Sequence, residues 1–199
     1  MGLKNRNNTD LRDYWKGGIR SYLGTTTSSF PNAFMCYTPF APTALSNGTS
    51  IIEVQCDFAA AAIQKILDSE KQGRKIKSIE PTPEAEDQWE AYVDAQNAQT
   101  LMPFTESWWT GANIPGKKSQ MLSYLKGLNV YEQEIQEKLE DWDGFDVRYC
   151  DAEESFEAGS ETTDSLKRKA EHVSHVEYAQ QDVEDASEAR DILRPTAVA

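Results

Sequence analysis

SIIEVQCDFAAAAIQKILDSEKQG, residues 50–73, is the stretch that decides the fold, because it carries the clearest helical pattern in the chain. Its apolar side chains recur every three or four residues, which predicts a helix with a wide apolar face. Ser50 and Glu53 form a capping-box pattern, and Gly73 suits the left-handed residue that ends a helix. We therefore expect one long helix from Ser50 to about Gln72.

Two shorter helices are expected after it. Thr82 is a suitable N-cap, and Pro83 fits the first turn of a helix. A further helix is expected from Asn129, where Asn-Val-Tyr-Glu is again a capping pattern, to just before Gly144. Helices therefore dominate the expected fold.

Short strands are expected between the helices. Residues 20–24 and 33–37 carry Tyr, Phe and Met and are bounded by Gly and Pro, and residues 76–80 predict a third, brief strand. The expected fold class is α/β, mostly helical with a few short strands.

The composition changes near the end of the chain. The 199 residues carry a formal charge of −13, and residues 151–199 contribute 13 acidic and 5 basic side chains to it. This stretch has too little apolar surface to offset roughly 1–2 kcal/mol of ordering entropy per residue. We therefore expect a disordered N-terminus over residues 1–10, a folded segment over 11–147 and a disordered acidic tail over 148–199.

The charge and the apolar pattern limit the expected partners. An acidic tail argues against nonspecific binding to nucleic acid or anionic membranes, since both are polyanionic. No apolar run reaches the ~18–20 residues of a membrane span, and the start has no secretory h-region. We expect a cytoplasmic protein that binds neither nucleic acid nor a membrane.

The cysteines and histidines suggest no metal site. Cys36, Cys56 and Cys150 are far apart and odd in number, so they form neither a disulfide framework nor a zinc pair. A reducing compartment fits best, with the first two as small buried apolar groups. His172 and His175, the only histidines, lie in the expected tail, so we predict no metal site and assign no catalytic residue.

Nucleotide-binding motifs are also sparse. GANIPGKK, residues 111–118, approaches a phosphate-binding loop, but Pro115 removes a backbone N–H that such a loop would offer to phosphate. No Gly-x-Gly-x-x-Gly fingerprint for a dinucleotide occurs in the sequence. Trp108 and Trp109 could stack on a ring system or belong to the core, and the core is favoured.

The order of several blocks resembles the C-terminal segment of flavin-dependent Baeyer–Villiger monooxygenases of the phenylacetone and cyclohexanone monooxygenase type. TPFAPTALSN, residues 38–47, is similar to the family's loop at the flavin and substrate. SWWTGANIPGK, residues 107–117, is similar to its most distinctive C-terminal signature. The resemblance spans about residues 11–147. It implies part of a flavoprotein with two dinucleotide-binding domains, in which the short strands would join a parallel sheet built mostly from other residues.

The resemblance implies a reaction and a set of site residues. FAD and NADPH are the expected cofactors, and a small ketone is the expected substrate, with oxygen inserted next to its carbonyl in natural-product biosynthesis. The residues expected to bind the cofactors are Thr38, Pro39, Asn47, Gly48 and Trp108. The residues expected to bind the substrate are Thr43, Ala44, Leu45 and Ser46. The N-terminus of the helix after Asn47 would stabilise negative charge on the reduced flavin.

Three hypotheses follow, because no stretch corresponds to the family's FAD fingerprint, NADPH fingerprint or active-site arginine. In the first, the chain is a truncated or split monooxygenase that needs a missing flavin-binding polypeptide to be active. In the second, it is a noncatalytic remnant that acts as a binding module. In the third, it is an interaction protein that works through its acidic tail.

Overall fold

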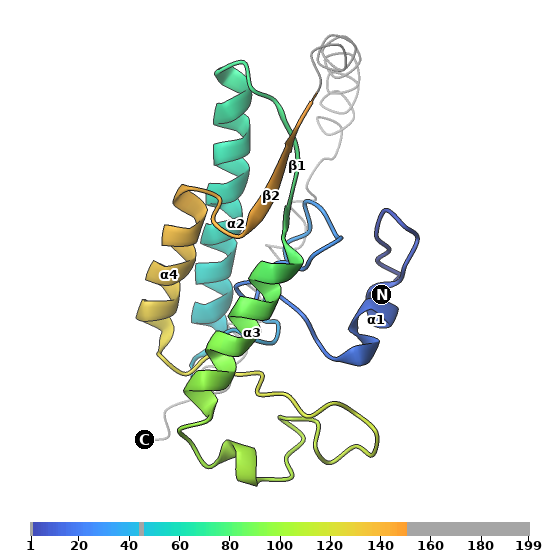
Figure 1. The fold of residues 1–199 in the computed structure, drawn as a ribbon. Coiled ribbons are helices and arrows are strands. Elements are labelled where there is room, and N and C mark those ends of the chain that lie inside the picture. Colours follow the sequence, from blue (N-terminus) through green and yellow to red (C-terminus); the bar gives the residue numbers. More distant parts are fainter. Residues whose placement is uncertain (1, 44–45, 151–199) are drawn as a thin grey trace, which may run out of the picture. The chain divides into compact units, whose positions relative to one another are not determined.

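The computed structural model describes residues 2–43 and 46–150, so most of the expected acidic tail lies outside the described residues (Figure 1). Within these ranges no helix is long and apolar enough to cross a membrane. The helices and strands are, in chain order, α1 (Leu11–Tyr14), α2 (Gly48–Lys71), β1 (Ile76–Pro81), α3 (Pro83–Asn97), α4 (Leu128–Glu140) and β2 (Phe145–Tyr149). Two one-turn 3-10 helices are Trp15–Gly17 and Met102–Phe104.

The long helix is confirmed as α2, but its cap differs from the prediction. The Asn47 side chain accepts hydrogen bonds from the backbone N–H of Thr49 at 2.9 Å and of Ser50 at 3.4 Å. Ser50 therefore lies inside the first turn, and the capping box predicted there is wrong. Asn is as good an N-cap as Ser, and Asn47 lies three residues earlier. At the other end Gly73 has a φ of 80°, as predicted for the stop.

The two shorter helices are confirmed as α3 and α4. The Thr82 hydroxyl accepts a hydrogen bond from the N–H of Ala85 at 3.1 Å, as expected for the N-cap of α3. The N-cap of α4 is Gly127, with a φ of 89° and no side-chain cap. The capping pattern predicted at Asn129 is wrong, because this residue is already helical.

The observed architecture is mixed helical with one small sheet. Strand β1 is confirmed at the position predicted, and it pairs antiparallel with β2, so the only sheet in the described ranges is not parallel. The strands predicted over residues 20–24 and 33–37 are wrong. Leu23, Gly24 and Tyr37 have φ values of 56°, 61° and 56°, in the left-handed region that no strand uses.

An irregular segment runs through the core instead of these strands. Residues 21–28 are all buried, although they form only turns and one isolated bridge. Gly24 is required here, because a Cβ at its φ of 61° would lie 2.8 Å from the Cβ of Ala41. Buried peptide groups without a ladder need other partners. Side chains of the three long helices supply several of them.

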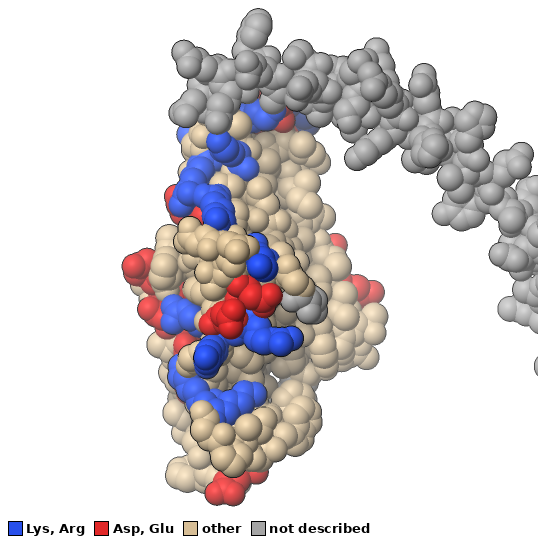
Figure 2. Space-filling model, turned by 90° about the vertical axis from the view of Figure 1, so that its right-hand side faces the viewer, with Lys and Arg blue, Asp and Glu red and all other residues tan. Residues whose placement is uncertain are grey.

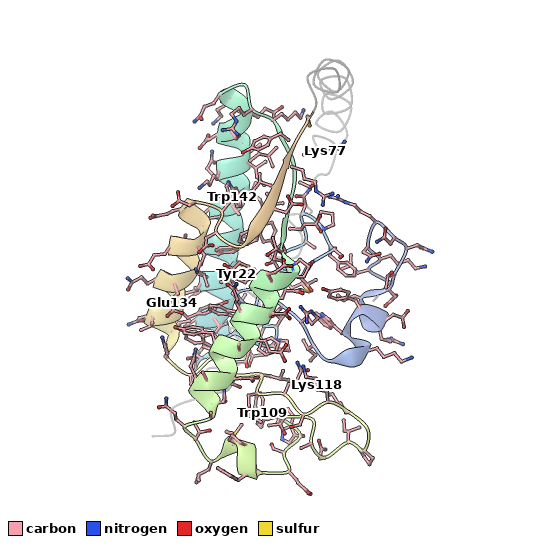
Figure 3. All side chains as sticks on the ribbon, viewed as in Figure 1. Tyr22, Lys77, Trp109, Lys118, Glu134 and Trp142 are labelled. Atoms are coloured by element: carbon pink, nitrogen blue, oxygen red, sulfur yellow. The ribbon has the colours of Figure 1, made fainter. Side chains whose placement is uncertain are left out.

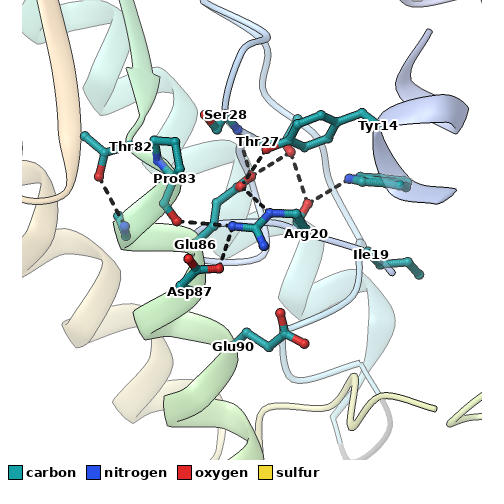
Figure 4. Close-up of polar contacts among 12 residues, drawn as sticks. Tyr14, Ile19, Arg20, Thr27, Ser28, Thr82, Pro83, Glu86, Asp87 and Glu90 are labelled. Carbon is teal, nitrogen blue, oxygen red and sulfur yellow. Dashed lines mark hydrogen bonds and ion pairs between the residues drawn. The ribbon is translucent and has the colours of Figure 1, made fainter. Parts of the chain in front are cut away.

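Glu86 of α3 is the largest such anchor (Figure 4). Its side chain is 1% exposed. One carboxylate oxygen accepts hydrogen bonds from the Thr27 hydroxyl and the Ser28 N–H, both at 2.8 Å. The other accepts from the Tyr14 hydroxyl at 2.9 Å and from Nε of Arg20 at 3.0 Å. One buried carboxylate thus fixes residues 14–28 against α3.

Arg20 balances the charge of this carboxylate. It also pairs with the more exposed Asp87, at 2.6 Å. Burial acts to lower the pKa of Arg20, but hydrogen bonds to Asp87 and Glu86 outweigh it and raise the pKa above its ordinary value. The guanidinium therefore stays charged in this cluster.

A second anchor joins α2 and α4. Gln55 is 1% exposed, and its amide nitrogen donates to the Gly24 carbonyl at 2.9 Å and to the Tyr131 hydroxyl at 3.0 Å. The Tyr131 hydroxyl in turn donates to the Leu23 carbonyl at 2.6 Å. The carbonyl groups of the left-handed turn are thus bound by side chains of two helices.

Replacing the Glu86 carboxylate by an amide tests the first anchor. In Glu86→Gln one acceptor oxygen becomes a donor that faces two donors, so we expect a loss of about 2–4 kcal/mol in the free energy of unfolding. Asp87→Asn is the matched control, since Asp87 is 63% exposed and should cost within about 1 kcal/mol. Urea unfolding followed by circular dichroism measures both, and equal losses would contradict the anchoring role.

Alkaline pH tests the second anchor. Burial raises the pKa of Tyr131, so above about pH 10 the unfolded chain releases a proton that the folded chain keeps. Stability that this tyrosine contributes below pH 10 is therefore lost as the pH rises. Tyr131→Phe should be about 1–2 kcal/mol less stable than the wild type at pH 8. Above about pH 10 its free energy of unfolding should fall less steeply than that of the wild type, with a difference in slope of up to about 1.4 kcal/mol per pH unit.

The exposed Tyr149 supplies the control for this experiment, because it is 40% exposed. Urea midpoints of Tyr149→Phe measured at the same pH values report the effect of removing a surface tyrosine hydroxyl, and the change in Tyr131→Phe should exceed it. A Tyr131→Phe profile parallel to that of the wild type would show that the buried hydroxyl does not set the alkaline limit.

Candidate functional site

Two segments that are far apart in the sequence meet at an open groove. It measures about 210 Å³ and is lined by Tyr37, Pro39, Thr43, Trp108, Trp109 and Leu122. Three of these residues, Pro39, Thr43 and Trp108, were expected at the cofactor or the substrate from the family resemblance. The structure therefore brings two expected cofactor residues and one expected substrate residue to the same place.

The Trp pair forms an aromatic platform beside this groove. The rings of Trp108 and Trp109 stack with centroids 4.3 Å apart and planes at 26°. Trp108 is 69% exposed, so the preference for a core position is wrong for this residue. Trp109 lies on the loop that follows α3 (Figure 3) and is half-buried. An exposed indole face is suited to stacking on a flat ring.

The loop that carries the Trp pair is attached to the N-terminal segment by Gln120. Its side chain accepts from the Ile19 N–H at 2.7 Å and donates to the Ile19 carbonyl at 2.9 Å, as a neighbouring strand would. Gln120 also donates to Glu90 of α3, which pairs with Lys118 at 2.8 Å. Lys118 is labelled in Figure 3. Figure 2 shows that Lys and Arg side chains gather along one face of the molecule, with acidic groups among them.

The N-terminus of α2 lies against the same groove. A Cβ at Gly48 would lie 3.2 Å from the Tyr37 ring, so a small residue lets the helix begin against this ring. Asn47 accepts hydrogen bonds from two N–H groups, and the first turn of α2 carries no acidic side chain. The positive end of the helix dipole is thus not neutralised by a carboxylate of its own first turn.

The remaining expected site residues have different positions. The Thr38 hydroxyl donates to the Gly24 carbonyl at 2.5 Å, so it is turned toward the irregular segment rather than the groove. Ser46 is half-buried just before α2. Ala44 and Leu45 lie outside the described residues. Of the nine expected residues, three therefore line the groove and two lie at the helix N-terminus beside it.

Sequence reasoning missed the residues that hold this groove in place. Tyr37 lines it, and its backbone N–H donates to the Gln55 side chain at 2.7 Å. Gln55 lies on the buried face of α2 between Ile51 and Phe58. A polar residue at an apolar position of a helix needs a hydrogen-bond partner, and that signal could have identified it.

The groove fits one face of a flat ring system rather than a whole cofactor. Its volume of about 210 Å³ is below the roughly 300–1,000 Å³ of ordinary ligand pockets. The stacked indoles, an apolar lining and a helix N-terminus suit an aromatic group that carries negative charge. Among residues 2–43 and 46–150, no group of three or more His, Cys, Asp or Glu could hold a metal ion.

Comparison with known proteins gives no matching family model but clear relatives. The chain is 36% identical over 149 residues to cyclohexanone 1,2-monooxygenase of Acinetobacter sp., which is 74% of this chain and 26% of that protein. It is 38% identical over 135 residues to a Baeyer–Villiger monooxygenase of Pseudooceanicola batsensis, 68% of this chain and 24% of that protein.

The comparison with solved structures gives the same kind of protein as the comparison of sequences. The crystal structure of cyclohexanone monooxygenase from Rhodococcus sp. Phi1 bound to NADP⁺ matches with a TM-score of 0.65 and 36% identity, over 74% of this chain and 27% of that one. The chain spans about a quarter of the length of the curated relatives it matches. The matched part of this chain is therefore homologous to a segment of the Baeyer–Villiger monooxygenases.

Proposed function

We propose that this chain supplies one wall of the flavin and ketone site of a Baeyer–Villiger-type monooxygenase. The observation that carries the proposal is the groove itself, where Pro39, Thr43 and Trp108 converge from two distant segments. In such an enzyme, FAD and NADPH supply the redox chemistry that inserts one atom of dioxygen next to a carbonyl. A cytoplasmic location is part of the proposal and rests on the sequence.

The chain's own residues would bind and orient the ring systems. Pro39, together with the backbone of Thr38, would contact the flavin ring, and Trp108 would stack beside the nicotinamide. The N-terminus of α2 at Asn47 and Gly48 would favour negative charge on the flavin. The segment from Thr43 to Ser46 would shape the ketone pocket. No acid or base of this chain is assigned a proton-transfer step.

Exposed apolar side chains support the proposal that a second polypeptide completes the site. Leu101 and Phe104 are 80% and 83% exposed, on the loop that leads to Trp108. On α2, Ile52, Ile63 and Leu67 are 40–49% exposed, although they extend its apolar face. Apolar surface that a chain leaves open often marks an interface. We propose that a flavin- and NADPH-binding polypeptide covers these surfaces.

Reconstitution tests this function. The full chain is mixed with Acinetobacter cyclohexanone monooxygenase that lacks its matching segment, and retained flavin absorbance and ketone-dependent NADPH oxidation are measured. Both should require the added chain. In Trp108→Ala, loss of the stacking face should weaken apparent NADPH affinity by about 3- to 10-fold, whereas Trp108→Phe keeps an aromatic ring and should lose less.

Two results would count against the proposal. One is reconstituted oxidation in which Trp108→Ala behaves like the wild type. The other is a failure of the wild-type chain to restore flavin retention, while the deleted segment of the relative itself restores it in the same assay.

A further inference from the structure

Two thiols of this chain meet beside the groove. Cys36 lies in the irregular segment directly before Tyr37, and Cys56 lies on α2 directly after Gln55. Their sulfur atoms are 3.8 Å apart, and both residues are exposed. The expectation that these cysteines are far apart and buried is therefore wrong. The separation along the sequence conceals this contact between the irregular segment and α2.

One hydrogen bond holds the segments of the two cysteines together. The N–H of Tyr37, the residue after Cys36, donates to the side chain of Gln55, the residue before Cys56, at 2.7 Å. Partial desolvation of the Cys36 thiol, followed by its hydrogen bond to Cys56, raises the pKa of Cys36, so this thiol holds its proton more tightly than a free one. A disulfide has an S–S length of about 2.05 Å, so the two sulfurs must approach by about 1.8 Å for the bond to form.

We propose that Cys36 and Cys56 are a redox-sensitive pair that closes to a reversible disulfide in the presence of a hydroperoxide. One of the two thiols loses its proton and attacks hydrogen peroxide as the thiolate, and the O–O bond breaks. The leaving hydroxide takes up the proton, so that a sulfenic acid and one water are formed. The second thiol attacks the sulfenic sulfur, the S–S bond forms and a second water leaves. The two thiols give up two electrons to the peroxide, and a dithiol reductant returns them by exchange.

The disulfide would act on the groove. The covalent ring would run from Cys36 through Tyr37, Pro39 and Thr43 to Cys56 in the third turn of α2. Closing the ring would fix the Tyr37 wall of the groove to α2 covalently, where the reduced chain has only the hydrogen bond to Gln55. Redox-active disulfides of intracellular proteins are commonly transient and regulatory. The inference does not depend on the proposed function, because it concerns thiols of the chain alone.

Peroxide treatment of the full chain tests the pair. After brief exposure to hydrogen peroxide, the chain should lose two of its three free thiols and show an intact mass lower by two hydrogens. Peptide mapping should join Cys36 to Cys56, and dithiothreitol should restore all three thiols. The oxidised chain should unfold at a higher temperature, since the closed ring restricts the unfolded state.

Single substitutions provide the controls. Cys150→Ser should still form the bond, because Cys150, directly after β2, is not one of the two thiols in contact. Cys36→Ser and Cys56→Ser should each keep their two remaining thiols or gain only oxygen. Hydrogen exchange at the Tyr37 amide should slow on oxidation of the wild type and of Cys150→Ser, but not of Cys36→Ser or Cys56→Ser. A bond to Cys150, a disulfide between two chains, or oxidation of both thiols to sulfinic acids without a bond would overturn the proposal.

Discussion

Burial of an irregular backbone segment is the constraint on which the rest of this structure depends. Residues 21–28 run through the core without a strand partner, and each unpaired peptide group there would cost about 1–3 kcal/mol. The cost is met by side chains: Glu86 from α3, Gln55 from α2 and Tyr131 from α4. The three helices are thus joined through this segment as well as by apolar packing.

The same hydrogen bonds place the candidate site. Gln55 binds the turn at Gly24 with one end of its amide and the Tyr37 N–H with the other, so the groove wall and the buried turn share one side chain. The contact between Cys36 and Cys56 is a consequence of this arrangement. A change in the buried turn should therefore reach the groove without altering any residue that lines it.

The sequence predicted elements with local signals and missed those set by tertiary contacts. The apolar period of α2, the Thr82-Pro83 start of α3 and the brief strand β1 were all readable, and the resemblance correctly indicated the family of the relatives. The strands expected near Leu23 and Tyr37 were wrong, because their left-handed backbone depends on acceptors and donors from distant helices. Strand propensity carries no information on such partners.

Prediction of the site was limited for the same reason. The resemblance indicated Pro39, Thr43 and Trp108, but only the fold brings them to one groove. Tyr37 is adjacent to the expected loop, yet its role depends on Gln55, eighteen residues further along the chain. Sequence periodicity identifies the face of a helix and not the backbone that this face meets.

Amide hydrogen exchange of Gln55→Leu tests the central claim most directly. Leucine keeps much of the side-chain volume and removes the amide that binds Gly24 and Tyr37. We predict that the Tyr37 amide and those of residues 21–28 exchange much faster than in the wild type, while α3 keeps its protection. Unchanged protection of the Tyr37 amide and of residues 21–28 in a folded Gln55→Leu chain would contradict the account.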